Sequence, residues 1–438
     1  MFTKITLKNF KVFDEIEFNL SDKKGKPLQY VFLYGENGAG KSSILESIDF
    51  LAKSFQTRFF YEEIEQLLIN GAVDSENLVK FISKLSRTIK DLASKKKMAD
   101  SNDEMLLQYD FLVNGKKVNY LLKFDDKSNL IEETLKYAFD KRIATVFSFT
   151  PKTIRFHKEF LISETYKDEL VELKIKWWGK HTLLSILFNE FGGANDEYFD
   201  KYINSDVLNV IRSIFGRLVG NLSGLPSRDF INMESSTFNG INDIKSGKIS
   251  SNNKTVLRDI ENLLTDLFTK ISPTINYVHY KVDEKDDEIE YKLFLNKKIA
   301  NCDLDISVDD ESRGTRNVIK LLPYFVKYFN NQICVLDEMD AGIHDLTFSY
   351  LVSNIVNYTS ESGQLIASCH NTKIINELDA HNVFLIKINA ENGIRSIESF
   401  ADLDVNYRSS NDQERKYLRD YLNFYYKENL DFSKWNKE

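Results

Sequence analysis

The sequence predicts an α/β protein built on a mixed sheet of the P-loop type, with an antiparallel β subdomain and an inserted helical subdomain. Three observations support this fold class. An apolar strand at residues 30–34 runs into a glycine-rich turn and then into a helix. A second apolar strand, at 333–336, ends in two adjacent carboxylates. Between them, residues 106–124 alternate apolar and polar side chains around Asn114-Gly115, a dipeptide typical of a two-residue hairpin turn.

The composition is typical of a soluble globular protein. No stretch of about 18 consecutive apolar residues is present, and the N-terminus lacks the basic and then apolar pattern of a signal peptide. The three cysteines, Cys302, Cys334 and Cys369, lie far apart, so we expect reduced thiols without a disulfide framework or a zinc site. We therefore expect a cytoplasmic location and no membrane partner.

The charge balance does not indicate a nucleic-acid-binding protein, although it leaves room for a local basic surface. The formal net charge is −8. The densest basic run, 95–97, is flanked by Asp91 and Asp100, and a solvated helix end explains it better than a DNA contact.

The first half of the chain starts with two strands. Residues 2–7 and 16–20 alternate apolar and polar side chains, and we expect them to form the first half of the nucleotide-binding sheet. Residues 55–97 have helix-compatible spacing with a break at Gly71 and Asp74, and another helix is expected at 175–191.

The second half begins with a segment rich in Ser, Asn and Gly at 224–253, which we expect to be a loop or linker. An amphipathic helix at 256–271 ends before Pro273, and strands follow at 277–282 and 289–295. The apolar stripe of that helix comprises Val256, Ile260, Leu263, Leu264, Leu267, Phe268 and Ile271.

These elements divide the chain into six segments. The expected boundaries are 1–54 for an N-terminal lobe, 55–105 for a helical insertion, 106–175 for the antiparallel β subdomain, 176–275 for a helical and loop insertion, 276–400 for a C-terminal lobe, and 401–438 for a helical tail with its helix at 412–427.

The glycine-rich turn predicts a nucleoside triphosphate site. In such a loop the backbone N–H groups surround the phosphates, Lys41 reaches the β and γ phosphates, and Ser42 is a ligand of Mg²⁺. The loop residues are Gly35, Glu36, Asn37, Gly38, Ala39, Gly40, Lys41, Ser42 and Ser43.

The candidate metal ligand, catalytic base and γ-phosphate sensor lie at the ends of two predicted strands. Asp337 is placed to hold Mg²⁺ through its water shell, and Glu338 to position and deprotonate the attacking water. His370 ends the apolar strand at 364–369 and is the candidate γ-phosphate sensor. A nucleophile made from Cys369 and His370 is excluded, because adjacent strand residues point to opposite faces. Upstream, a turn at 312–314 precedes a helix expected from Asn317 and resembles an anion-binding N-terminus.

Taken in chain order, these motifs resemble the ABC-type ATPases of the Rad50/SMC/RecF/OLD-like branch. The match covers about 1–55 and 305–390. The resemblance implies an ATPase head, an opening strand ending in the basic Lys11 near the nucleotide, and an ATP-binding signature at Ser312 and Gly314. It also implies a D-loop residue at Asp340, a Walker B pair at 337–338 and a switch histidine at His370.

Within that branch, the segments 337–344, 311–316 and 370–372 look most like those of compact bacterial AAA family ATPases of the OLD-like group, which often serve antiphage systems. The ATPase subunits of PARIS (AriA-like) and of Septu (PtuA-like) are both similar in size and layout. The resemblance implies ATP and Mg²⁺ as cofactors and a homodimer or higher homo-oligomer with ATP between the heads. It also implies a separate Toprim or HNH nuclease effector, and a trigger that is DNA or a phage protein.

Departures from the pattern limit the resemblance. Glu311 and Arg313 replace the leucine and glycine of the transporter signature, which argues against a transporter subunit. No glutamine fits the Q-loop: Gln108 lies too early, and 180–190 offers only Ser185, Asn189 and Glu190. The alternative functions are a RecF-like clamp that binds duplex DNA and a scaffold that binds ATP without turnover.

Overall fold

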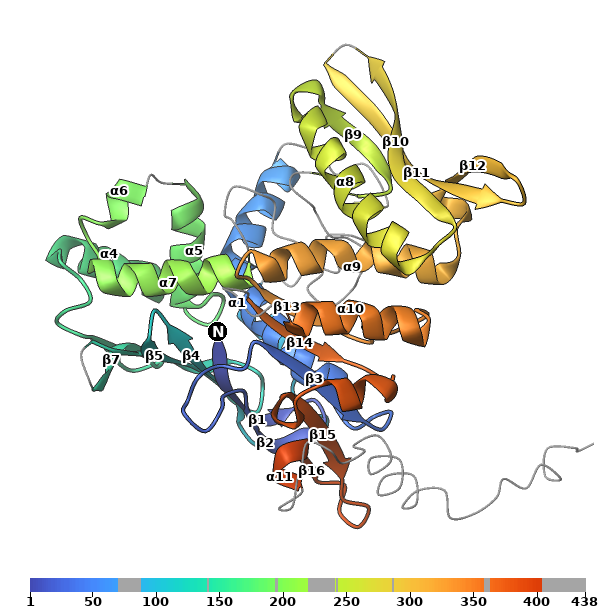
Figure 1. Ribbon diagram of the computed structural model, residues 1–438. Helices are drawn as coiled ribbons and strands as arrows, with labels where there is room; N and C mark the ends of the chain where they lie inside the picture. The colour runs from blue at the N-terminus through green and yellow to red at the C-terminus, as the bar shows by residue number, and fades with distance from the viewer. Residues whose placement is uncertain are drawn as a thin grey trace, which may run out of the picture.

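A five-stranded mixed sheet forms the centre of the structure, a computed structural model that describes residues 1–69, 88–139, 142–193, 196–219, 241, 243–285, 287–357 and 363–403 (Figure 1). Its strands lie in the order β13 (Ile333–Leu336), β14 (Gln364–Ser368), β3 (Tyr30–Gly35), β15 (Val383–Ile388) and β16 (Arg395–Ser399). The first four strands are parallel, and β16 pairs antiparallel with β15. The predicted α/β class with a mixed sheet is therefore confirmed.

The antiparallel subdomain is a seven-stranded sheet. In spatial order its strands are β2 (Phe13–Asn19), β1 (Phe2–Phe10), β4 (Met105–Val113), β5 (Lys116–Phe124), β6 (Leu130–Ala138), β7 (Ile143–Phe149) and β8 (Ile154–Phe156). The predicted hairpin is confirmed, since Asn114 and Gly115 have φ values of 50° and 76° and Val113 pairs with Lys116. One expectation is wrong: β1 pairs with β4, so the first two strands belong to this sheet and not to the nucleotide-binding sheet.

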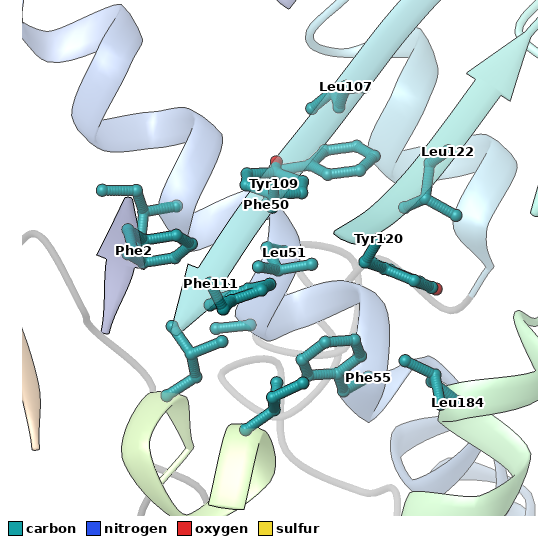
Figure 2. Close-up of a cluster of buried hydrophobic side chains, with 14 of the residues drawn as sticks. Phe2, Phe50, Leu51, Phe55, Leu107, Tyr109, Phe111, Tyr120, Leu122 and Leu184 are labelled. Atoms are coloured by element: carbon teal, nitrogen blue, oxygen red, sulfur yellow. The ribbon is translucent and has the colours of Figure 1, made fainter. Parts of the chain in front are cut away.

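Helix α1 (Lys41–Ile69) packs between these two sheets. Val31 and Leu33 of β3 point into this core, so one face of the mixed sheet is buried against the helix and the antiparallel sheet. Figure 2 shows the centre of the cluster, where α1 meets β4, β5 and α5. Its labelled side chains are Phe2, Phe50, Leu51, Phe55, Leu107, Tyr109, Phe111, Tyr120, Leu122 and Leu184.

The opposite face of the mixed sheet is covered by α9 (Arg313–Phe329) and α10 (Asp345–Asn357). Phe32 and Tyr34, which alternate with the residues of the first core, point into this second core. The same core includes α8 (Lys254–Ile271) and its small sheet, drawn in yellow in Figure 1. That sheet contains β9 (Ser246–Ser250), β10 (Ile275–Lys285), β11 (Glu288–Ile299) and β12 (Cys302–Ser307). The predicted helix at 256–271 and the two predicted strands after it are confirmed, but Leu263 is exposed.

The remaining helices depart from the expected boundaries. They are α3 (Ile89–Ser94), α4 (Glu164–Trp177), α5 (Leu183–Gly193), α6 (Asp196–Phe199), α7 (Ser205–Leu218) and α11 (Phe400–Leu403). The helix expected at 175–191 is two helices, because Gly179 has a φ of +80° and separates α4 from α5. Since α4 begins at Glu164, the antiparallel subdomain ends before residue 175.

Some expectations fall partly or wholly beyond the described residues. The break expected at 71–74 and the tail helix expected at 412–427 lie outside them. The same is true of most of the segment expected to be a linker at 224–253, but residues 246–250 of that segment form β9 and are therefore not a loop.

Candidate active site

The motifs meet at one edge of the mixed sheet because three parallel strands end there. The glycine-rich loop follows β3, the two carboxylates follow β13, and His370 follows β14. β14 lies between the other two strands. Neighbouring strands are about 5 Å apart, so the loop and the carboxylates are separated by about 10 Å, enough for a phosphate group and a metal ion to lie between them.

The glycine-rich loop has the backbone of a phosphate cradle. Gly35, Gly38 and Gly40 all have positive φ, at 149°, 81° and 115°. A Cβ on Gly40 would approach the ring of Phe13 to 2.5 Å, so only glycine fits at this position. The open backbone and the start of α1 directly behind it suit an anion.

Lys41 is buried in this loop. Its Nζ donates hydrogen bonds to the carbonyl oxygens of Gly35, at 2.7 Å, and Glu36, at 3.1 Å. Burial lowers its pKa, and the carboxylates of Asp337 and Glu338 oppose that shift. The ammonium therefore lies within the field of the acidic pair, as a shared metal and phosphate position requires.

The acidic pair is fixed by Ser368, the last residue of β14. The Ser368 hydroxyl donates to Oδ1 of Asp337 and accepts the N–H of Glu338 at 2.7 Å. Glu338 has a φ of +48°, a conformation that is uncommon for residues other than glycine. Its side chain is exposed, so the carboxylate is accessible to a water molecule.

His370 lies beside the candidate base. Its Nε2 is 4.0 Å from Oε1 of Glu338, and both side chains are well exposed. Asp340 holds the backbone here, because its Oδ2 accepts the N–H groups of His370, at 2.9 Å, and Asn371, at 2.6 Å. Asp340, the D-loop residue that the resemblance implies, thus joins the loop after β13 to the histidine loop.

The signature turn lies at the start of α9. This helix begins at Arg313 and not near Asn317, because the Ser312 hydroxyl caps it by accepting the N–H of Thr315 at 3.2 Å. Gly314 packs against the loop after β13, where a Cβ would lie 3.1 Å from the carbonyl oxygen of Gly342. The turn is thus joined to the loop that follows the acidic pair.

Lys11, which the resemblance places near the nucleotide, is paired with a carboxylate of α1. Its ammonium forms an ion pair with Glu46 on α1, which Lys96 also contacts at 2.9 Å. The neighbouring residues Val12 and Phe13 pack against Gly40, so the β1–β2 turn supports the phosphate loop from outside.

The residues considered for a Q-loop lie away from this edge. Ser185 binds Thr57 through its hydroxyl at 2.9 Å, and Asn189 donates to Glu62 at 2.9 Å. Glu62 is about 30 Å from Lys41 along the axis of α1. Glu190 accepts from Tyr166 at 3.0 Å. These hydrogen bonds therefore join α5 to α1 and α4.

Sequence reasoning missed Ser368 and Tyr34. The Tyr34 hydroxyl donates to the carbonyl oxygen of Asn371 at 2.8 Å, which ties the end of β3 to the histidine loop. The sequence gives only a weak signal for the roles of these two residues. Ser368 is a hydroxyl residue at the end of an apolar strand, and Tyr34 is a polar tip in an otherwise apolar run.

The donor set fits Mg²⁺. Within the described part of the chain, no group of three or more His, Cys, Asp or Glu side chains is arranged to hold a metal ion. Mg²⁺ in nucleotide sites is typically held by one or two protein oxygens together with phosphate oxygens and water. Ser42 and Asp337 would supply those protein oxygens.

No helix of the described residues is long and apolar enough to cross a membrane.

The match to a family model agrees with a nucleotide site. A family model described as AAA ATPase domain matches residues 1–375. Among solved structures, the SmcHead bound to the C-winged helix domain of ScpA is 15% identical, with a TM-score of 0.47 over 92% of this chain and 98% of that chain. The SMC head domain from Thermotoga maritima is 13% identical, with a TM-score of 0.36 over 91% and 98%. No curated protein matches the chain.

Proposed function

The chain belongs to the family of AAA ATPase domains and is an ATPase, and we propose that it is a Mg²⁺-ATP switch whose two protomers close head to tail around ATP. The observation that carries this proposal is the meeting of Lys41, the acidic pair and His370 at the ends of three parallel strands. In such a site Mg²⁺ neutralises charge on the phosphates and orients them.

Each protein group has one task in the proposed mechanism. Lys41 moves from the loop carbonyls to the β and γ phosphates, and Ser42 with Asp337 would hold Mg²⁺. Glu338 accepts the proton of the attacking water. His370, 4.0 Å from that carboxylate, donates to the γ-phosphate and keeps the base oriented.

In the proposed dimer, the signature turn of one protomer contacts the ATP that is bound to the other protomer. Ser312 and the first turn of α9 present N–H groups to the γ-phosphate bound in the opposite head. ATP then binds most tightly in the closed state, so hydrolysis loosens the interface and shifts the population toward the open form. Within its own protomer, Gly314 packs on the loop after β13, which also follows the catalytic pair.

Two substitutions test the proposed base and the phosphate loop. We expect Glu338→Gln to bind ATP normally, to lower turnover about 10²–10⁴-fold and to accumulate as an ATP-bound dimer. Lys41→Ala should weaken ATP binding and dimerisation together. Phosphate release, nucleotide titration and size-exclusion chromatography with Mg²⁺-ATP measure these effects. Glu15→Gln, on an exposed strand position, is the control, and wild-type turnover in Glu338→Gln would show that the base is wrong.

At the level of the cell, we propose that this switch acts in the cytoplasm in antiphage defence and restrains a separate nuclease effector, of the Toprim or HNH type, until DNA or a phage protein triggers it. The resemblance of the 337–344 segment and of the signature to compact OLD-like ATPases supports this role. Copurification from cells with and without the neighbouring gene tests it, and unchanged stoichiometry and toxicity would remove the effector. Binding to plain duplex DNA with a steep salt dependence would favour the RecF-like clamp instead.

A further inference from the structure

Ser368, the last residue of β14, is bonded to both residues of the acidic pair that follows β13, the candidate metal ligand and the candidate base. We propose that Ser368 is a positioning residue, whose hydroxyl holds Asp337 and Glu338 in the geometry that Mg²⁺ binding and water activation require. This inference rests on the proposed roles of those two carboxylates, and it assigns to β14 a part in catalysis beyond carrying His370.

The first argument is the number of bonds that end on this one residue. Its hydroxyl donates to Oδ1 of Asp337 and accepts the N–H of Glu338 at 2.7 Å. Its carbonyl oxygen accepts the next N–H, that of Met339, at 3.0 Å. Ser368 is fully buried, so water cannot replace these bonds. Its place is set by the register of β14, which is paired on both sides by β13 and β3.

The second argument is the strained backbone of the base. Glu338 has a φ of +48°, a left-handed conformation that is unfavourable for a residue with a side chain. Such a conformation persists when surrounding bonds impose it. Here the bond to the Ser368 hydroxyl fixes the N–H of the strained residue itself.

The third argument concerns the metal ligand. A carboxylate that binds a metal is commonly oriented by a neighbouring donor, and loss of that donor lowers metal affinity or activity about 10–100-fold. The Ser368 hydroxyl is such a donor on Asp337. Because one hydroxyl serves both residues, its loss should disturb metal binding and base orientation together.

Hydrogen exchange of the nucleotide-free protein tests the proposal without any turnover. In Ser368→Ala we expect the amide of Glu338 to exchange about fivefold faster than in the wild type, which corresponds to the loss of one hydrogen bond. The amide of Met339 is an internal control, because its bond to the Ser368 carbonyl oxygen remains. Ser368→Thr keeps a hydroxyl and should restore slow exchange. Unchanged exchange of Glu338 in Ser368→Ala would overturn the proposal.

Mg²⁺ titration of turnover is the second measurement. We expect Ser368→Ala to raise the half-saturating Mg²⁺ concentration about tenfold, with rescue by Ser368→Thr. Ser54→Ala removes another fully buried serine, on α1, and controls for the general cost of a lost hydroxyl. A Mg²⁺ requirement that stays unchanged in Ser368→Ala would also count against the proposal. If the wild type shows no turnover, the proposed function fails, while the exchange result still decides the role of Ser368.

Discussion

Gly40 is the tightest point of the phosphate loop, and its surroundings make a prediction at the scale of one residue. A Cβ there would meet Phe13 at 2.5 Å, in addition to the strain of a φ of +115°. Gly38 also has a positive φ, of 81°, but a Cβ there would meet nothing within 4 Å. The two glycines therefore separate backbone strain from steric overlap.

We expect Gly38→Ala to lower the free energy of unfolding by about 1 kcal/mol through backbone strain. Gly40→Ala should cost about 1–3 kcal/mol more, because the methyl group overpacks a filled site. Urea unfolding of both variants measures the difference. Adding Phe13→Leu to Gly40→Ala shortens the opposing side chain and should recover part of the loss. Equal costs for the two glycine variants would contradict the packing argument.

The sequence indicated the chemistry of single residues more readily than their neighbours. The phosphate loop, the carboxylate pair and His370 stand in short local patterns, so their convergence followed from the rule that parallel strands end at one edge. Ser368 and Tyr34 act through contacts across strands, and those depend on register, which no local pattern specifies. For the same reason the ion pair between Lys11 and Glu46 was not predicted.

At the scale of the element, helix α5 is held to β6 by a buried carboxylate. Glu133 accepts the N–H groups of Leu183, at 2.7 Å, and Leu184, at 3.3 Å, together with the hydroxyl of Tyr120 at 3.0 Å. Burial raises its pKa from 4.5 to about 7. The charged carboxylate thus caps the N-terminus of α5, although burying this charge costs desolvation free energy.

The raised pKa of Glu133 determines whether the free energy of unfolding increases or decreases with pH. The folded protein holds the Glu133 proton more tightly than the unfolded chain, so its contribution to stability is complete below pH 4.5 and is lost as the pH rises through about 7. The loss amounts to about 3 kcal/mol. In Glu133→Gln this dependence should disappear.

Urea unfolding at several pH values between 4 and 8, for the wild type and Glu133→Gln, checks the effect. The difference between the two free energies should change steadily with pH. Burial lowers the pKa of His181 to about 3, and its titration has the opposite sign. Since His181 is present in both proteins, its contribution cancels in the comparison. Parallel curves for the two proteins would refute the assignment.

Element boundaries were predicted where local chemistry marks them. The hairpin turn at 114–115 and the amphipathic period of α8 are local signals, and both elements are confirmed. The helices near residue 175 were placed wrongly, because Trp177 and Leu183 continue an apolar pattern across the break at Gly179. Buried side chains on both sides of a turn look like one helix when only their spacing is considered.

At the scale of the whole molecule, the mixed sheet is buried on both faces. Along β3, Val31 and Leu33 face α1 and the antiparallel sheet, while Phe32 and Tyr34 face α9 and α10. A continuous apolar run predicts burial on both faces of a parallel strand. It cannot predict which element covers each face. β1 and β2 were assigned to the wrong sheet for this reason. The pairing of β1 with β4, which lies about a hundred residues later in the chain, gives no local signal in the sequence.

Gln364 connects the two large sheets and makes the last prediction. Its Nε2 donates to the carbonyl oxygens of Phe2, at 3.0 Å, and Leu28, at 2.9 Å, and its Oε1 accepts the N–H of Phe2 at 2.8 Å. Gln364→Leu would leave these buried backbone groups without their partner, at about 1–3 kcal/mol for each group. We expect a loss of about 3 kcal/mol or more in urea unfolding, with faster hydrogen exchange at Phe2. Gln108→Leu, which removes only a 3.4 Å bond to Asp110, should cost less than about 1 kcal/mol. Similar losses for the two variants would show that the sheets are joined by apolar packing alone.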